Sequence, residues 1–173
     1  MAVKEILLLG NPILRRRCKA VRDVRAKDVG TAIADLRETL ADFRARSGFG
    51  RGIAAPQIGV TQQIVYINFE YTGALINPRI TKRGRTKFRL WDDCFSFPDI
   101  LVFLERNMSV EVAFLDERGT KRTLKARGGL AELLQHEIDH LNGVLAIDRA
   151  LDSKHIILRR EYERRSRTAS VTM

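Results

Sequence analysis

Two of the three histidines in this chain lie four residues apart, in the stretch Gln135-His136-Glu137-Ile138-Asp139-His140. On an α-helix, which turns about 100° per residue, His136 and His140 lie about 40° apart on one face, and Glu137 stands beside them. Two neutral imidazoles at this spacing can bind a divalent cation, while the carboxylate takes a proton from a water held there. The alternative is an amphipathic helix that carries these residues by chance. Because both histidine positions are filled, the stretch favours a hydrolytic metal centre.

A catalytic metal of this kind needs a third protein ligand and keeps one open position. One class of zinc protease has a third histidine at the position that Ala146 occupies here, so that class is excluded. Another class uses a more distant glutamate, and Glu161 is a candidate, although it lies among arginines where a local ion pair is the simpler role. Cys94 is the stronger candidate, because it lies in a polar, turn-like context and a metal would hold it as the thiolate.

The composition is typical of one globular domain. The chain has 173 residues, of which 45% are hydrophobic and 30% charged, enough to bury a core. No apolar run approaches the roughly 18 residues of a membrane span, and we expect neither a membrane segment nor a secretory leader. The two cysteines, Cys18 and Cys94, are too few for a disulfide framework and suit a reducing compartment. We therefore expect a cytoplasmic protein in which Cys94 is free to bind a metal.

The formal net charge is +10, and the basic residues are clustered. One run from Lys82 to Arg89 contains no acid, and a second cluster extends from Lys154 to Arg167. Such fields attract polyanions, although a solvated, solubilising surface is the simpler alternative for either cluster alone. No helix-turn-helix or RNA-reading signature accompanies them. Because of the two basic clusters, a non-catalytic protein that associates with the ribosome remains an alternative to an enzyme.

The elements that must position these side chains follow from the apolar pattern. Apolar residues at spacings of three and four predict a helix from about Thr31 to Arg46. Gly128-Gly129 begins the helix that carries the two histidines, and Asn142-Gly143 ends it. A last helix is expected from about Ser153 to Arg165. Alternating and β-branched residues predict strands at 63–69, 75–76, 80–88, 101–104, 110–115 and 120–126.

Three segments of the chain, taken in order, resemble the peptide deformylases. They are the loop Gly50-Arg51-Gly52-Ile53-Ala54-Ala55-Pro56-Gln57, the segment Asp92-Asp93-Cys94-Phe95-Ser96, and the stretch from Gln135 to Gly143. The family shows a GxGxAAxQ loop, a segment with a metal-binding cysteine, and QHExDHLxG. This order and spacing are far more specific than the pair of histidines alone, and the resemblance extends from about Gly10 to Asp148.

The resemblance implies an α+β fold in which antiparallel strands pack around the central helix of the two histidines. Residues 1–152 would form one catalytic domain, and residues 153–173 a basic C-terminal helix and tail. Cys94, His136 and His140 would bind one divalent metal ion, with a water at the fourth position. The family usually works with Fe(II), although Zn or Ni can occupy the same ligands. Glu137 would act as general base and then as general acid.

The reaction that the resemblance implies is hydrolysis of the N-formyl group on the N-terminal methionine of a nascent polypeptide, with release of formate. Gln57 and the backbone N–H of Phe95 would stabilise the developing oxyanion. Gly52 would let the substrate backbone approach closely. For the methionine side chain we expect an apolar pocket beside the metal, lined by Leu133 with help from Ile53 or Phe97. Near the ligands, we expect Arg106 to pair with Asp92.

Three departures from the family pattern matter for the site. Asp93 replaces a glycine and Phe95 a leucine in the cysteine segment, which is usually EGCLS, and Arg51 stands where an apolar residue near the substrate is usual. Asp93 adds a charge beside the thiolate and restricts the backbone. We expect a divergent member that still hydrolyses an N-formyl group but has a shifted preference, for instance for an acidic group that meets Arg51.

The resemblance also implies partners. A deformylase meets nascent chains where they leave the ribosome, so we expect the segment from Arg159 to Arg167 to contribute to attraction by the ribosome. We expect a monomer in the cytoplasm with no membrane contact. An HExxH peptidase that uses Glu161 as its third ligand remains the second enzymatic alternative.

Overall fold

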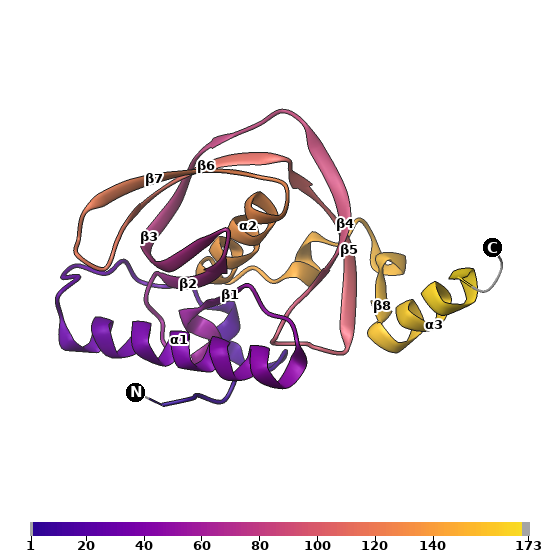
Figure 1. Cartoon of the computed structure of the whole chain (residues 1–173), viewed down its shortest axis with the longest axis horizontal. Coiled ribbons are helices and arrows are strands. Elements are labelled where there is room, and N and C mark those ends of the chain that lie inside the picture. The colour runs from indigo at the N-terminus through magenta and orange to yellow at the C-terminus, as the bar shows by residue number, and fades with distance from the viewer. Residues whose placement is uncertain (1, 171–173) are drawn as a thin grey trace.

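The computed structural model describes residues 2–170, and the side chains of residues 2–165. The last three residues of the predicted tail, and the side chain of Arg167 in its basic cluster, lie outside the described residues. The fold is α+β, with helices α1 (Lys27–Ser47), α2 (Gly129–Leu141) and α3 (Arg159–Ser170) and two antiparallel sheets (Figure 1). In residues 2–170 no helix combines the length and apolar character needed to cross a membrane.

The larger sheet has the strand order β1-β2-β3-β6-β7 and the smaller one the order β4-β5-β8. All neighbouring strands in both sheets are antiparallel. The strands are β1 (Gly52–Ala54), β2 (Ile64–Phe69), β3 (Tyr71–Arg83), β4 (Lys87–Asp93), β5 (Ile100–Asn107), β6 (Ser109–Leu115), β7 (Lys121–Arg127) and β8 (Ile156–Leu158).

Helix α2 lies inside the curve formed by the two sheets, while α1 runs along the outside of β1 and β2 (Figure 1). Side chains on β2 alternate between these two environments, as the period of a strand requires. Val65 and Ile67 pack in the core around α2, whereas Ile64 and Tyr66 pack against α1. Every residue from Leu130 to Leu141 is buried, so the polar side chains of α2 must find partners inside the protein.

Helix α1 begins at Lys27, four residues before the predicted start at Thr31. Val29 extends its buried stripe toward the N-terminus, although Gly30 is a poor helix former that weakens the pattern there. At the other end Gly48 adopts a left-handed conformation with φ of 77° and closes the helix. The chain then returns through β1 toward the histidine helix.

The predicted bounds of the strands at 75–76 and 80–88 are wrong, because the chain does not turn at Asn77-Pro78. One strand, β3, continues through this pair with a register shift between Ile76 and Arg79. Asn77 adopts a φ of 51°, and its side chain exchanges hydrogen bonds with the backbone of Val21. The chain turns instead at Gly84, whose N–H donates to Ser109 O at 2.8 Å, and β4 follows.

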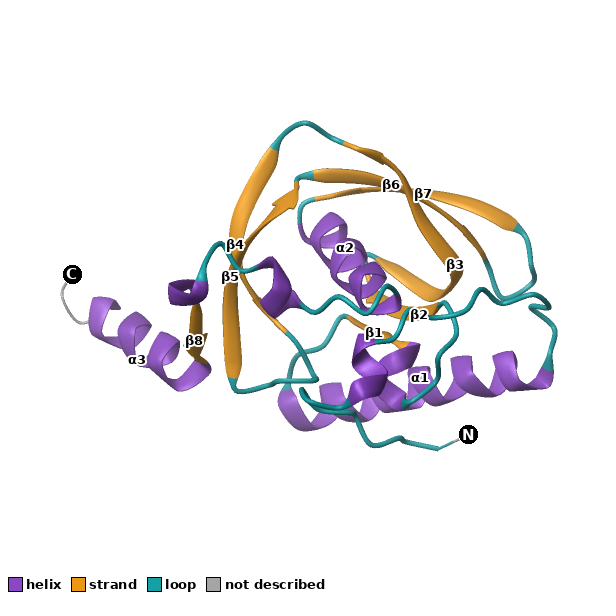
Figure 2. Ribbon diagram, turned by 180° about the vertical axis from the view of Figure 1, so that it is seen from behind, coloured by secondary structure: helices purple, strands orange, loops and turns teal. Residues whose placement is uncertain are grey.

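The predicted helix from Ser153 begins later than expected. Residues Ser153–His155 form a short 3-10 turn, and Ile156–Leu158 form β8, which pairs with β5. The apolar run in β8 completes the smaller sheet, and α3 starts only at Arg159. Figure 2 shows α3 projecting from the outer side of this sheet, away from α1. The C-terminal segment is thereby joined to the body through a strand.

Candidate metal centre

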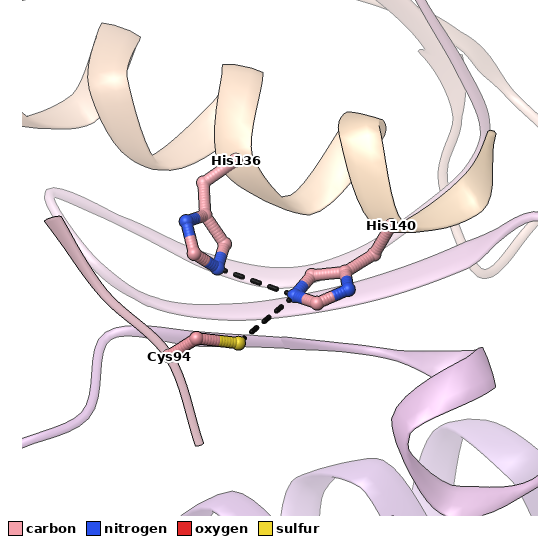
Figure 3. Close-up of side chains that lie close together, drawn as sticks. All are labelled: Cys94, His136 and His140. Carbon is pink, nitrogen blue, oxygen red and sulfur yellow. Dashed lines mark hydrogen bonds between the residues drawn. The ribbon is translucent and has the colours of Figure 1, made fainter. Parts of the chain in front are cut away.

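Helix α2 presents His136 and His140 toward the turn that follows β4, where Cys94 lies (Figure 3). The two Nε2 atoms of the histidines are 3.2 Å apart, and Cys94 Sγ is 3.3 Å from His140 Nε2. All three side chains are buried. The structure therefore brings together the three residues that the sequence indicated as ligands.

These distances fit a single metal ion. In a tetrahedral site with bonds of about 2.0–2.3 Å, two ligand atoms lie about 3.4–3.6 Å apart. The three ligand atoms here lie within 4.8 Å of one another, close to that requirement. One sulfur and two imidazole nitrogens form a donor set suited to zinc, iron or nickel rather than to magnesium or calcium.

Charged residues around the histidines fix their orientation. His136 Nδ1 lies 3.1 Å from Asp92 Oδ2, which leaves His136 Nε2 to face the other ligands. Arg106 Nη2 is 3.2 Å from the same Asp92 oxygen, so the predicted pair of Arg106 and Asp92 is confirmed. Arg106 Nη1 also donates to Asp139 Oδ2 at 2.5 Å. Arg106 thus connects α2 with the end of β4.

The two histidines differ in their affinity for protons. Burial by itself would lower the pKa of His136, but the Asp92 carboxylate raises that pKa well above its ordinary value. For His140, burial and the neighbouring His136 charge together put the pKa well below its ordinary value. Of the two rings, His136 therefore holds a proton more strongly than His140. A metal ion must displace that proton, since it binds the neutral ring.

Glu137 lies beside the ligands in a site that suits proton transfer. Its side chain is buried, and Oε2 has no hydrogen-bond partner among the residues whose side chains are described. Burial raises the pKa of Glu137 to about 7, although the charge of His136 opposes the shift. A carboxyl group with a pKa near neutrality can both accept and return a proton.

Gly52, in β1, is in close contact with α2. A Cβ atom at this position would lie 3.0 Å from Glu137 Oε1 and 3.2 Å from Leu133 Cδ1. Even the smallest side chain would therefore press on the carboxylate. The glycine leaves room for Glu137 as well as for anything that approaches the backbone of β1.

Gln57 belongs to the short 3-10 helix Ala55–Ile58 and is held at both ends of its amide. Its Oε1 accepts a hydrogen bond from Ala54 N at 2.9 Å, and its Nε2 donates to Ser96 Oγ at 3.3 Å and lies 3.6 Å from Cys94 Sγ. These contacts direct the amide N–H group toward the ligand cluster. The ring of Phe95, next to Cys94, stacks on Phe43 with centroids 3.9 Å apart.

A cleft of about 560 Å³ opens beside the ligands. Eight of the predicted site residues contribute to its lining: Arg51, Gly52, Gln57, Cys94, Phe95, Leu133, His136 and Glu137.

Two predicted pocket residues lie elsewhere, which corrects that part of the sequence analysis. Ile53 is fully buried and packs in the core beneath α1, because its side chain leaves β1 on the face opposite to that of its neighbours in the alternating strand. Phe97 packs in the core of the smaller sheet. Leu133 is thus the apolar side chain of the predicted pocket that reaches the cleft.

Sequence reasoning missed several charged residues of the cleft, among them Glu132 and Arg159. Glu132 lies one helical turn before His136, a spacing that places both on one face, and it pairs with Arg51. Arg159 Nη2 lies 2.7 Å from Asp93 Oδ2, and its Nε donates to Pro98 O at 2.7 Å. The spacing to His136 could have indicated Glu132, whereas no local signal pointed to Arg159.

Glu161, the alternative third ligand, is not near the histidines. It lies in the first turn of α3, where Arg164 Nη2 is 2.6 Å from its carboxylate. Cys94 occupies the third position in the cluster instead. The local ion pair that the surrounding arginines suggested is the role that Glu161 has.

Comparisons of the sequence and of the structure with known proteins point to the same family. The model of the family described as "Polypeptide deformylase" matches residues 3–155. Peptide deformylase 2 of Clostridium perfringens is 36% identical over 160 residues, which cover 91% of this chain and 99% of that protein. A peptide deformylase of Prochlorococcus marinus is 40% identical over 152 residues, covering 84% of this chain and 72% of that protein.

The fold agrees with these sequence matches. The crystal structure of the peptide deformylase from Thermotoga maritima superimposes with a TM-score of 0.81 at 33% sequence identity. The superposition covers 88% of this chain and 100% of that chain. The similarity in fold therefore extends over most of the chain.

Proposed function

The chain belongs to the peptide deformylase family, and from this premise we propose that Cys94, His136 and His140 hold the one divalent metal ion on which its reaction depends. Members of the family remove the N-formyl group from nascent polypeptides, and this chain is a hydrolase of that class. The observation that carries the ligand assignment is the approach of one thiol and two imidazoles to 3.2–3.3 Å.

Fe(II) is our proposal for the native ion, with Zn or Ni able to occupy the same ligands. When bound, the ion would lower the pKa of a water molecule and polarise the formyl carbonyl. The thiolate of Cys94 and the two neutral rings would leave one position open for these oxygens. Asp92 would keep His136 in the tautomer that presents Nε2.

Glu137 is the residue that we propose moves the proton. Its carboxylate would take a proton from the attacking water and deliver it to the amine nitrogen as the C–N bond of the formamide breaks. Formate and a free N-terminal amine are the products. The buried position of Glu137 and its unpartnered Oε2 support this role, because the proton acceptor must lie next to the open metal position.

Gln57 and the backbone N–H of Phe95 would donate hydrogen bonds to the oxygen on which charge develops. The contacts of Gln57 with Ala54 and Ser96 support this role, since a donor that is already oriented costs no reorganisation during the reaction. Removal of one such donor lowers the rate by about 100- to 1,000-fold in other hydrolases. Gly52 would leave space for the substrate backbone along β1.

Formate release by the iron-loaded protein, handled without oxygen, tests this proposal. We expect turnover of formyl-Met-Ala-Ser, and a fall of about 100- to 10,000-fold in kcat for Glu137→Gln, with one metal ion per chain in both proteins. As a matched control, Glu161→Gln removes a carboxylate outside the cluster and should change neither quantity. A metal-loaded wild-type protein that releases no formate from any formylated peptide would refute the proposed function.

We further propose that the protein acts in the cytoplasm as a monomer and contacts the ribosome through its basic C-terminal helix. The net charge of +10 and the basic residues of α3 support attraction to a polyanion. We also propose that residues 1–152 form the catalytic domain, with residues 153–173 as a basic attachment. Within that attachment β8 pairs with β5, so the two parts share a sheet.

A further inference from the structure

The cleft wall carries an ion pair at the place where an apolar pocket was expected. Arg51 Nη2 lies 2.6 Å from Glu132 Oε2, and the side chain of Glu132 is only 3% exposed. The guanidinium group also lies over the ring of Phe69, 5.4 Å from its centroid, and Nη1 lies 3.4 Å from Gly129 O. Three contacts therefore hold Arg51 in one position, with 38% of its side chain exposed.

This ion pair adjoins the reacting groups. Glu132 precedes the ligand His136 by one turn on the same face of α2, and Arg51 precedes Gly52, which touches Glu137. In an N-formyl substrate, the first side chain begins three bonds from the formyl carbon, a distance of about 4 Å. When the formyl group lies at the proposed ligands, that side chain can reach the wall formed by Arg51, Glu132 and Leu133, which lines the same cleft.

A thioether is a poor partner for this wall. Methionine offers no hydrogen-bond donor and only a weak acceptor. It would therefore cover the exposed part of Arg51 without replacing the hydrogen bonds that Arg51 makes to water. A guanidinium group has five N–H donors, and Arg51, which lines the cleft, uses only some of them in its contacts with Gly129 and Glu132. An oxygen acceptor on a side chain of similar length can bind to them.

The charges of the wall disfavour an ion in the same place. Glu132 already pairs with Arg51, Arg159 with Asp93 and Arg106 with Asp92, so a substrate ion would lose its water without gaining a charged partner of its own. A cation would meet Arg51 itself. The expected preference for an acidic group at Arg51 is therefore replaced by a preference for a neutral one.

We propose that the Arg51–Glu132 pair makes this deformylase select N-formylated substrates whose first side chain is neutral and carries a hydrogen-bonding oxygen, such as a carboxamide or a sulfoxide, over methionine. The inference rests on the proposed function, because it concerns the same cleft. Arg51 and Glu132 act as specificity-determining residues, while Leu133 packs against the methylene groups that both kinds of side chain share.

Matched peptides test the preference. Formyl-X-Ala-Ser peptides with X as glutamine, methionine sulfoxide, methionine, norleucine or glutamate differ mainly at the end of one side chain. For the wild-type protein we expect kcat/KM for glutamine and for the sulfoxide to exceed that for methionine and norleucine by about tenfold or more. The double variant Arg51→Leu/Glu132→Leu removes both charges together and should reverse the order.

A second ion pair provides the control. Lys87 Nζ lies 3.0 Å from Glu105 Oε1 on the smaller sheet, outside the cleft. The double variant Lys87→Leu/Glu105→Leu makes the same change in composition and should keep the wild-type order of substrates. An equal shift in both double variants would assign the effect to net charge or stability and would overturn the inference.

The binding affinity of the peptides tests the same preference without depending on turnover. Calorimetry on the Glu137→Gln protein should give a Kd for formyl-Gln-Ala-Ser about tenfold lower than for formyl-Met-Ala-Ser. Equal or tighter binding of the methionine and norleucine peptides would overturn the inference, whether or not formate is released. Absence of formate from every peptide, together with this order of affinities, would refute the proposed function and leave the specificity inference standing.

Discussion

At the scale of single residues, the proposed metal site depends on the thiol of Cys94. We expect Cys94→Ser to reduce metal content to less than a tenth of one ion per chain, because a neutral hydroxyl is a much weaker ligand than a thiolate. Elemental analysis after dialysis measures this. The control is Cys18→Ser, since Cys18 is buried away from the cluster and burial raises its pKa to about 11, which keeps the thiol protonated at neutral pH. Full metal content in Cys94→Ser would contradict the ligand assignment.

Gly52 allows a second prediction at this scale. Gly52→Ala places a methyl group 3.0 Å from Glu137 Oε1, so we expect the carboxylate to shift and kcat to fall by about tenfold or more. Gly30→Ala is the control, because its Cβ would meet nothing within 4 Å on the exposed side of α1 and should stabilise the helix by up to about 1 kcal/mol. Unchanged turnover in Gly52→Ala would show that Glu137 tolerates the displacement.

The sequence predicted some of the site residues and missed others for a physical reason. His136, Glu137 and His140 interact through local spacing on one helix, and Cys94 and Gln57 stood in short motifs that could be read directly. The pair of Arg51 and Glu132 joins residues 81 positions apart, and its formation depends on how β1 packs against α2. Such a contact has no signature in one sequence.

At the scale of elements, one buried arginine connects α2 with β4. Arg106 is 5% exposed and lies between Asp92 and Asp139, so its removal leaves Asp92 with His136 alone and Asp139 with the partly exposed Arg149 alone. We expect Arg106→Met to lower the free energy of unfolding of the metal-free protein by about 3–5 kcal/mol, measured by urea denaturation. Lys87→Met breaks an exposed pair, which solvent screens, and should leave the free energy of unfolding almost unchanged. Similar losses in the two variants would contradict the bridging role of Arg106.

Elements with a long, regular pattern were predictable, and short or irregular ones were not. The histidine helix has clear start and stop residues, and the structure confirms it. Strand β3 was divided in the prediction because Asn77-Pro78 normally marks a turn, whereas here the Asn77 side chain binds the backbone of Val21 and the strand continues. Strand β8 exists because β5 offers an edge for Ile156–Leu158, a tertiary condition that no local pattern reveals.

At the scale of the whole molecule, the charge distribution predicts a salt-dependent interaction. A protein that lacks residues 161–173 loses Arg164, Arg165 and Arg167, half of the basic residues of the C-terminal cluster, but keeps Arg159, which lies in the cleft. We expect weaker sedimentation with ribosomes at low salt, a smaller difference at high salt, and unchanged turnover of a short formylated peptide. Ribosome binding equal to that of the full chain would contradict the proposed contact.

The ion pair between Arg159 and Asp93 bears on the order in which the parts of the cleft are synthesised. A polypeptide is made from its N-terminus, and the last wall of the cleft is supplied by a residue close to the other end of the chain. Cys94 and Gln57 emerge first, the two histidines later, and Arg159 later still. The cleft is therefore complete only after Arg159 has been synthesised, and a copy truncated before α2 lacks two of the three proposed metal ligands, His136 and His140.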